Sequence, residues 1–286
     1  MIKFSRVGLI VKYNDDGVTT TLNDAIACVK RHGLELAMEH STRLLTGDDN
    51  TVSLEEIATS CDLAVVIGGD GTLLGVARAL IDHNLPIVGV NRGRLGFLVD
   101  VSPKNELHEL DLILSGEYVK EERSLLKSRV LRDGECVASS HAFNDTVIRV
   151  RDRLQIMDYD IIIDDLLVTH QRADGLIIAT PSGSTAYSLS NGGPIVAPTI
   201  DALIVHPICP HTLSSRPLLV EGNSCIRVHL WDDEVSDAQI VCDGQIYMGA
   251  MLGDMVEITR HTNKVQMLHP ENYDYYRVLR EKLNWG

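Results

Sequence analysis

Residues 68–72 read Gly-Gly-Asp-Gly-Thr and stand between an apolar run and a helical pattern. The apolar run at 63–67 predicts a strand, and the spacing of leucine, valine and alanine predicts a helix over 72–84. Glycine lets backbone N–H groups come close to a phosphate, and a helix N-terminus offers free N–H groups to an anion. The stretch therefore predicts a phosphate-binding loop. A tight turn capped by Asp70 is the alternative.

Asp70 is the unusual member of this loop, because a carboxylate repels a phosphate. It makes chemical sense if it takes a proton from an attacking hydroxyl, or if it holds Mg²⁺. The sequence leaves both roles open. The loop lacks the GK[ST] of a Walker A motif, and it is not a G-x-G-x-x-G fingerprint.

Asn144 and Asp145 stand together before a second apolar run. An amide donates and accepts hydrogen bonds, whereas a carboxylate only accepts them. Such a pair can hold ribose hydroxyls or an amide-bearing ring. A polar turn is the alternative, because Asn-Asp is common in turns.

The stretch from 172 to 196 is dense in hydroxyl groups and glycine. Arg172 and Asp174 flank a turn that precedes a predicted strand. Side chains with which the stretch can bind phosphate, ribose or a base are Ser182, Ser184, Thr185 and Tyr187. The spacing is not G-x-S-x-G, which disfavours a serine hydrolase. A long Ser/Gly loop without a ligand is the alternative, although long loops in compact domains usually carry function.

Three further features carry weaker signals. His206 and His211 lie five residues apart without an acidic or cysteine ligand at a usual spacing, so they are expected to be structural rather than metal ligands. Residues 242–245 predict a hairpin turn at which Gln245 offers a polar contact. The six cysteines are scattered and form no C-x-x-C pair, so we expect reduced thiols, most of them buried, and no zinc site.

The elements that must position these residues change character along the chain. The first third alternates strands, over 7–13, 34–40, 63–69 and 85–91, with helices over 20–32, 53–60 and 72–84. A further helix is expected from Pro103, capped by Ser102. Strands and helices in alternation predict a parallel, doubly wound sheet.

After about Arg123 the pattern becomes all-β. Asp133-Gly134 and Asp164-Asp165 interrupt strand-like runs and predict hairpin turns. The tail is helical, with Tyr276, Leu279 and Leu283 on one stripe, and is expected to fold back on the first domain. The expected domains are an α/β domain at 1–122 plus 262–286, and an all-β domain at 123–261.

Composition limits the class of protein. The chain has 286 residues, 44% hydrophobic and 23% charged, as in an ordinary globular protein. The formal net charge of -14 disfavours nucleic acid and anionic membrane as partners. No run approaches the roughly 18 apolar residues that cross a bilayer. The N-terminus is too short and too charged for a secretory signal. We therefore expect a cytoplasmic protein.

Taken together, the motifs resemble those of the NAD kinases, in order and spacing, over about residues 60–245. GGDGT alone is shared with diacylglycerol-type lipid kinases and phosphofructokinases, whereas the Asn-Asp pair followed by TAYSLS is more specific. The resemblance implies a Rossmann-like α/β domain, a β-sandwich-like C-terminal domain that binds NAD, and a last helix that returns to the first domain.

The resemblance also implies a reaction. It is the transfer of the γ-phosphoryl group of ATP, or of polyphosphate, to the 2′-hydroxyl of the adenosine ribose of NAD, which yields NADP. A divalent metal, usually Mg²⁺, accompanies the donor, and members are commonly homodimers or homotetramers. Length and acidity look like a bacterial member. The competing hypotheses are a lipid or sugar kinase that shares GGDGT, and an NAD(H)-sensing module that binds without reacting.

The resemblance assigns roles to individual positions. Asp70 would activate or place the ribose hydroxyl, and Asp174 would contact NAD near the chemistry. Arg172 would pair with phosphate. The other residues expected to hold NAD are Gly71, Asn144, Asp145, Thr185, Ala186, Tyr187, Ser188, Leu189, Ser190 and Gln245. Many relatives have Glu where this chain has Asp145, which shortens the reach of that contact by one methylene.

Overall fold

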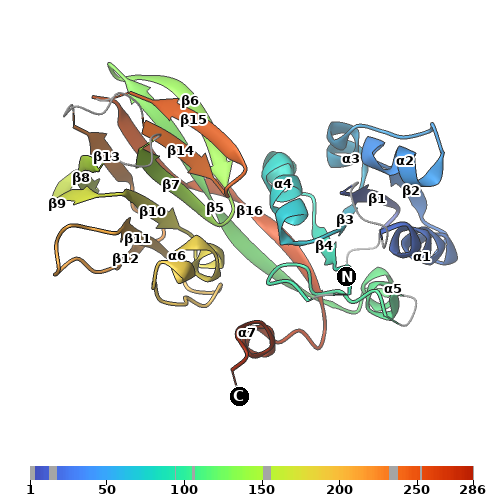
Figure 1. The fold of residues 1–286 in the computed structure, drawn as a ribbon. Coiled ribbons are helices and arrows are strands. Elements are labelled where there is room, and N and C mark those ends of the chain that lie inside the picture. The colour runs from blue at the N-terminus through green and yellow to red at the C-terminus, as the bar shows by residue number, and fades with distance from the viewer. Residues whose placement is uncertain are drawn as a thin grey trace. The chain divides into compact units, whose positions relative to one another are not determined.

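The structure, a computed structural model, describes residues 4–12, 18–93, 95–104, 107–150, 156–231, 238–251 and 253–285. The chain forms two compact units (Figure 1). Unit 1 comprises residues 1–122 and 263–286, and unit 2 comprises residues 123–262. Strands β5 (Tyr118–Arg132) and β16 (Met255–Pro270) each have residues in both units.

Unit 1 is built on a parallel sheet in the order β2-β1-β3-β4. Its strands are β1 (Arg6–Val11), β2 (Glu35–Met38), β3 (Leu63–Ile67) and β4 (Ile87–Val90). The distal part of β16 pairs with β4 through Met267 and Ile87. Every residue of β3 and β4 is buried, as expected for strands covered on both faces. Tyr13, expected in the first strand, lies outside the described residues.

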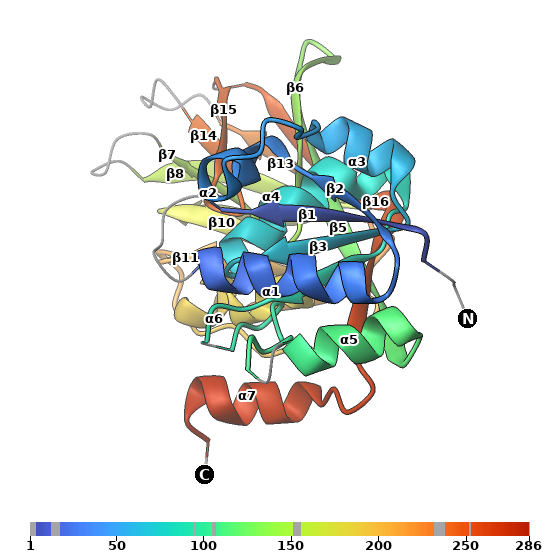
Figure 2. The same ribbon diagram turned by 90° about the vertical axis from the view of Figure 1, so that its right-hand side faces the viewer.

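Helices cover both faces of this sheet, as Figures 1 and 2 show. One face packs on α1 (Val18–Arg31) and α5 (His108–Ser115) through a valine- and leucine-rich core. The other face packs on α3 (Leu54–Ser60) and α4 (Asp70–Leu80). Glycine permits this close approach, since a Cβ on Gly8 would lie 2.5 Å from the side chain of Ile57 in α3.

The described part of unit 1 has four further helical segments. They are η1 (His40–Thr42), α2 (Arg43–Thr46), η2 (Ile81–His83) and α7 (Tyr275–Leu283). The prediction of a helix from Pro103 was wrong: α5 begins at His108, and the hydroxyl of Ser102 accepts the Lys104 N–H instead of capping a helix. In α7 the buried residues are Val278 and Leu279, whereas Tyr276, placed on the apolar stripe, is exposed.

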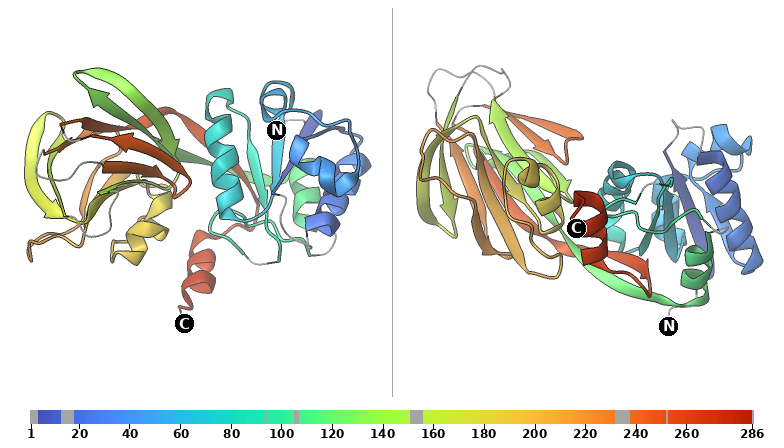
Figure 3. Two further views of the ribbon diagram at one scale, coloured as in Figure 1. Left: turned by 45° about the horizontal axis from the view of Figure 1, so that its top comes forward. Right: turned by 60° about the horizontal axis from the view of Figure 1, so that its bottom comes forward.

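Unit 2 is a sandwich of two antiparallel sheets (Figure 3). One sheet has the order β12-β11-β10-β7-β14-β15. Its strands are β7 (Asp145–Val150), β10 (Gly175–Ala179), β11 (Ala202–Ile208), β12 (Leu218–Glu221), β14 (Ala238–Cys242) and β15 (Ile246–Ala250). The other contains β6 (Glu135–Ala142), β8 (Met157–Ile163), β9 (Leu166–Ala173) and β13 (Ile226–Leu230), with parts of β5 and β16.

Apolar side chains from both sheets fill the space between them. Tyr159 of β8 is fully buried there and donates its hydroxyl to the carbonyl of Gly175, 3.1 Å away. The hairpin turns stand where the sequence predicts them, with positive φ at Asp133, Gly134, Asp164 and Asp165. These turns allow the strands to pair in sequence order.

Three observations complete the fold. Residues 182–190 are not a loop, because they form η4 (Ser182–Thr185) and α6 (Tyr187–Ser190). All six cysteines are free, but only Cys28 and Cys242 are buried, so the expectation that most are buried was wrong. Within the described residues, no helix combines the length and apolar character needed to cross a membrane.

Candidate functional site

The GGDGT segment joins the carboxyl end of β3 to the N-terminus of α4. Gly69 is the N-cap residue, and its carbonyl accepts the N–H groups of Thr72 and Leu73. A Cβ on Gly68 would lie 2.7 Å from the Thr72 hydroxyl oxygen, so only glycine fits without a shift. Asp70 is the first residue of the helix rather than its cap. This is the edge at which open α/β sheets bind ligands, and a helix N-terminus there favours an anion.

The carboxylate of Asp70 is held by a second loop of unit 1. Its Oδ2 accepts the N–H of Phe97 at 2.9 Å, and its Oδ1 accepts those of Leu98 and Val99 at 3.0 and 3.2 Å. Gly96 makes room for this arrangement, because a Cβ there would lie 2.2 Å from Oδ1. These contacts fix the direction of the carboxylate, and a carboxylate with about four acceptor sites retains capacity for one more donor beyond these three.

Unit 2 holds Asn144 and Asp145 through a residue from a distant hairpin. Asp243 lies in the turn between β14 and β15 and accepts three consecutive backbone N–H groups. Its Oδ1 accepts those of Asn144 at 2.7 Å and Asp145 at 3.2 Å, and its Oδ2 accepts that of Phe143 at 2.9 Å. The amide–carboxylate pair is therefore fixed at the start of β7, where the sequence left a polar turn as the alternative.

Asp145 is 4% exposed. Burial and the nearby charge of Asp243 raise its pKa to about 7, although a hydrogen bond from the Tyr187 N–H acts in the opposite direction. A carboxyl group that titrates near neutral pH in a pocket is a mark of functional sites.

Most hydroxyl groups of segment 181–190 make hydrogen bonds within the protein. Ser184 is buried and donates to the Pro181 carbonyl at 2.6 Å. Thr185 donates to the Ser182 carbonyl, while Ser188 lies 3.4 Å from Nδ1 of His206. Arg123 donates to the Ser182 hydroxyl at 3.0 Å. These contacts hold η4 and α6 in place, so their backbone rather than these hydroxyls is positioned to meet a ligand.

Close packing ties this segment to the amide–carboxylate pair. A Cβ on Gly183 would lie 2.0 Å from the carbonyl oxygen of Asn144. The Thr180 hydroxyl donates to the Phe143 carbonyl at 2.7 Å. The two motifs of unit 2, separated by about 40 residues in the sequence, are therefore packed against each other.

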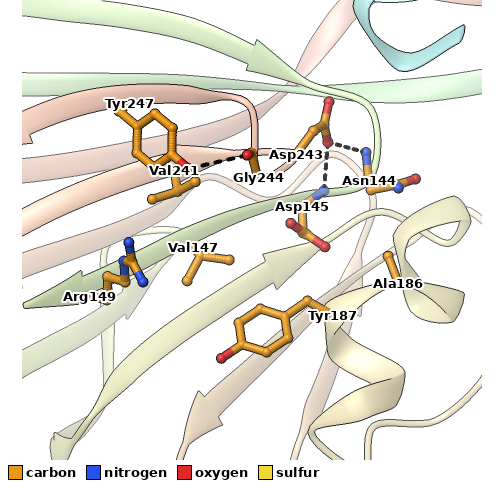
Figure 4. A pocket seen from close by; sticks show the side chains of 10 residues that line it. All are labelled: Asn144, Asp145, Val147, Arg149, Ala186, Tyr187, Val241, Asp243, Gly244 and Tyr247. Carbon is orange, nitrogen blue, oxygen red and sulfur yellow. Dashed lines mark hydrogen bonds between the residues drawn. The ribbon is translucent and has the colours of Figure 1, made fainter. Parts of the chain in front are cut away.

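A pocket of about 340 Å³ opens on the outer face of the six-stranded sheet, at these motifs. Figure 4 shows its lining, with dashed lines from Asp243 to the backbone nitrogens of Asn144 and Asp145. The lining residues are Asn144, Asp145, Val147, Arg149, Ala186, Tyr187, Val241, Asp243, Gly244 and Tyr247. It offers an aromatic ring, an amide and a carboxyl group at one place, which suits a nucleoside.

Four of the candidate residues line this pocket: Asn144, Asp145, Ala186 and Tyr187. Thr185, Ser188, Leu189 and Ser190 belong to the same short helical segment but are not among its lining residues. Arg172, exposed on β9, lies 3.8 Å from Asp158, and Asp174 follows it as an exposed residue before β10. Gln245 is exposed in the β14–β15 turn. Asp70 and Gly71 belong to unit 1.

The expected structural role of the histidines fits the contacts of His206. It is buried and accepts the Asn191 amide at 3.0 Å, and burial lowers its pKa. His211 is exposed. Within the described part of the chain, neither histidine nor Asp70 belongs to a group of three or more His, Cys, Asp or Glu side chains that could hold a metal ion. Mg²⁺ often relies on one or two carboxylates plus substrate phosphates, so a single carboxylate at the phosphate loop still fits it.

The sequence reasoning missed several lining residues, Asp243, Arg149 and Tyr247 above all. Asp145, Val147 and Arg149 alternate along β7 and therefore share its outer face. The register that pairs Thr146 with Cys242 brings the next turn, with Asp243, against them. Strand alternation was visible in the sequence, whereas this register was not.

Unit 1 carries a glycine-rich loop with an oriented carboxylate, and unit 2 carries a nucleoside-sized pocket. Each is a feature expected of a nucleotide phosphotransferase. The comparisons define the family. The ATP-NAD kinase N-terminal domain matches residues 7–118, and the ATP-NAD kinase C-terminal domain matches residues 143–269. The chain therefore belongs to the NAD kinase family. This decides against a lipid or sugar kinase that shares only GGDGT.

Curated relatives match over their full length. An NAD kinase of Thiobacillus denitrificans is 46% identical over 288 residues, covering 100% of this chain and 98% of the relative. An NAD kinase of Teredinibacter turnerae is 41% identical over the same length, with the same coverage of 100% and 98%.

Solved structures agree on the fold. An NAD kinase from Archaeoglobus fulgidus in complex with ATP aligns with a TM-score of 0.76 and 26% identity, covering 98% of each chain. Yeast NADH kinase complexed with NADH aligns with a TM-score of 0.87, covering 99% of this chain and 88% of that chain. Because the two sequences are only 23% identical, this alignment supports the fold alone.

Proposed function

We propose that the chain transfers the γ-phosphoryl group of ATP to the 2′-hydroxyl of the adenosine ribose of NAD and so makes NADP. The observation that carries this proposal is the Asp70 carboxylate, held by three backbone N–H groups at the N-terminus of α4. Phosphoryl transfer depends on positioning and charge neutralisation. A fixed carboxylate at a phosphate loop accepts the proton of the attacking hydroxyl, and membership of the NAD kinase family supplies the substrates.

The pocket of unit 2 is proposed to bind the NAD molecule. Tyr187 offers a ring on which a base stacks, and Asn144 and Asp145 offer donors and acceptors for ribose hydroxyls or an amide. Ala186 brings backbone close to the ligand. The contacts of Asp243 and Gly183 support this role, because they fix the pair before any ligand binds.

The remaining assignments are proposals by family position. Gly71 lies in the first turn of α4 beside Asp70. Arg172 and Asp174 are proposed to meet NAD phosphate and NAD near the chemistry, and their exposure leaves them accessible. Further proposed pocket residues are Thr185, Ser188, Leu189, Ser190 and Gln245. Mg²⁺ would neutralise charge on the transferred phosphoryl group, and holding that ion is the alternative role of Asp70 to that of proton acceptor.

The test is NADP formation by the purified chain, read through an NADP-specific dehydrogenase. NAD is offered with ATP and Mg²⁺, and polyphosphate and NADH are offered in parallel. Asp70→Ala is expected to lower turnover by about 10²–10⁴-fold, the usual contribution of a positioned general base. Asp70→Asn keeps the size of the side chain and should lose turnover as well. Asp82→Asn, an exposed aspartate just beyond α4, is the matched control and should keep it.

Each result has a consequence. Near wild-type turnover in folded Asp70→Ala would remove Asp70 from the mechanism. No NADP with any donor, from folded protein that still binds NAD, would make the chain an NAD(H)-sensing module instead.

The wider biological setting is also proposed. We expect a cytoplasmic protein, since all six cysteines are free thiols. We expect a homodimer or homotetramer by family position. Units 1 and 2 are proposed to be the two functional domains. Light scattering during size-exclusion chromatography checks the oligomer, and a monomer would refute that expectation.

A further inference from the structure

Three side chains with metal-binding atoms meet in unit 1, between α1 and α5. Cys28 lies in α1, His32 lies just beyond its last residue, and Asp111 lies in α5. The Cys28 sulfur, a His32 ring nitrogen and an Asp111 oxygen all lie within 4.8 Å of one another. Within the described residues this is the one group of three or more such side chains that could hold a metal ion.

The distances approach those of a tetrahedral zinc site. With Zn–S of about 2.3 Å and Zn–N or Zn–O of about 2.0–2.2 Å, neighbouring ligand atoms stand about 3.3–3.6 Å apart. Here Cys28 Sγ lies 3.6 Å from Asp111 Oδ1, and His32 Nε2 lies 3.0 Å from the same oxygen. The Cys28 sulfur and the His32 nitrogen lie within 4.8 Å, so closing the group on an ion requires these side chains to rotate.

The backbone places the two ligands of the first segment on one face. The N–H of His32 donates to the carbonyl of Cys28, so the helical turn continues to His32. Residues four apart in a helical turn present their side chains together. Asp111 comes from a different helix, and α5 packs against α1 on the same face of the sheet. An ion bound by all three would therefore cross-link the two helices.

Burial is graded across the group. Cys28 is fully buried, the His32 side chain is 22% exposed and that of Asp111 is 37% exposed. His32 and Asp111 are therefore in contact with solvent, which can supply water as a fourth ligand. The guanidinium of Arg31 lies 3.4 Å from Asp111 Oδ1, but its side chain is half exposed and can turn to solvent when a cation replaces it.

Although the cysteine spacing predicts no zinc site, we propose that Cys28, His32 and Asp111 bind one Zn²⁺ ion, which joins α1 to α5 and stabilises unit 1. A thiolate and an imidazole select a borderline-soft ion such as zinc and disfavour Mg²⁺, which takes oxygen ligands. The site lies on the α1–α5 face of the sheet, whereas Asp70 begins a helix on the opposite face. It is therefore a separate site from the magnesium proposed for phosphoryl transfer.

The first experiment titrates the metal-free full chain with Zn²⁺ against a chromophoric chelator. Wild type should bind one tight equivalent, and thermal unfolding should shift upward with Zn²⁺. His32→Gln and Asp111→Asn should weaken that equivalent at least tenfold, about the loss seen when even the outer partners of a metal site are removed. Cys136→Ser, which changes an exposed cysteine outside the group, should bind like wild type.

The second experiment identifies the sulfur ligand. Co²⁺ bound by a thiolate gives a charge-transfer absorption, which should be lost in Cys28→Ser and kept in Cys136→Ser. Cys28 is fully buried, so circular dichroism must show that Cys28→Ser is folded. If it is not, Cys28→Ala removes the sulfur without placing a hydroxyl in the core. The proposal is overturned if wild type binds no tight equivalent, or if the folded variants bind Zn²⁺ and Co²⁺ as wild type does. A group held only by its hydrogen bonds would give that result.

Discussion

Replacing Asp145 by asparagine should stabilise the protein, and more so at higher pH. The carboxyl is 4% exposed and its pKa is raised to about 7, chiefly by burial and then by the charge of Asp243, from an ordinary value of 3.8. The folded state therefore binds a proton more tightly than the unfolded state. Stability falls as pH rises through the window between these two values and is level above it.

The size of the effect follows from the shift. At about 1.4 kcal/mol per pKa unit, ionising Asp145 costs the folded state on the order of 4 kcal/mol above pH 7. At pH 5 about 1–2 kcal/mol of this cost is already present, by the same conversion. Asparagine has nearly the same shape and no charge. The stability advantage of Asp145→Asn should therefore grow by about 2–3 kcal/mol between pH 5 and pH 8.

The assay is urea unfolding of both proteins at pH 5 and pH 8, without ligand. Comparing the growth of the difference removes any constant effect of exchanging an acid for an amide. Asp133→Asn, in the exposed turn between β5 and β6, is the matched control and should follow wild type at both pH values. An Asp145→Asn advantage that does not grow with pH would refute the burial argument. A smaller advantage at pH 8 than at pH 5 would mean that the carboxylate is the form the fold prefers.

Three further predictions use other contacts of the structure. Asn144→Ala should raise the apparent KM for NAD more than it lowers kcat, and the reverse would mean that this contact forms mainly in the transition state. In thermal unfolding, Gly183→Ala should destabilise the chain by about 1–3 kcal/mol, because its Cβ would lie 2.0 Å from the Asn144 carbonyl oxygen. The control Gly249→Ala, which has no atom within 4 Å of its Cβ, should leave the unfolding temperature nearly unchanged. Equal effects of the two variants would refute the steric argument. Burial lowers the pKa of His269, but its contacts with Asp100 at 2.8 Å and Glu121 at 3.2 Å outweigh burial and raise that pKa overall. The stability that protonated His269 adds should be complete below its unfolded pKa of about 6.5, and it should be lost as pH rises through the raised pKa of the folded state. In urea unfolding, the stability advantage of wild type over His269→Gln should therefore shrink with rising pH. An advantage that stays constant with pH would contradict this prediction.

Much of the fold was predictable because it depends on the spacing of apolar, glycine and turn residues along short stretches of the sequence. Alternating strands and helices predicted the parallel sheet, and the turns at Asp133-Gly134 and Asp164-Asp165 predicted hairpins. The start of α5 was not predictable from its capping signal. Leu107, just before it, has φ of 61°, and Ser102 and Lys104 bond to each other before the helix begins.

In the candidate site too, the sequence identified the residues but not the contacts that orient them. Gly-rich spacing after a strand identified Asp70 as a residue of interest, and the Asn-Asp pair identified Asn144 and Asp145. The contacts that orient them come from distant parts of the chain. Residues 97–99 hold Asp70 across 27–29 positions, and Asp243 holds residues 143–145 across 98–100 positions.

The sequence by itself determined most element types, the glycine-rich segment between a strand and a helix, and the family resemblance, because these depend on residue types at short spacing. Only the tertiary structure decided that Asp145 is buried beside Asp243 and that Asp111 meets Cys28 and His32. The physical reason is register and packing. A strand pairing or helix contact joins residues 80 to 100 positions apart, and no local pattern encodes which of them meet.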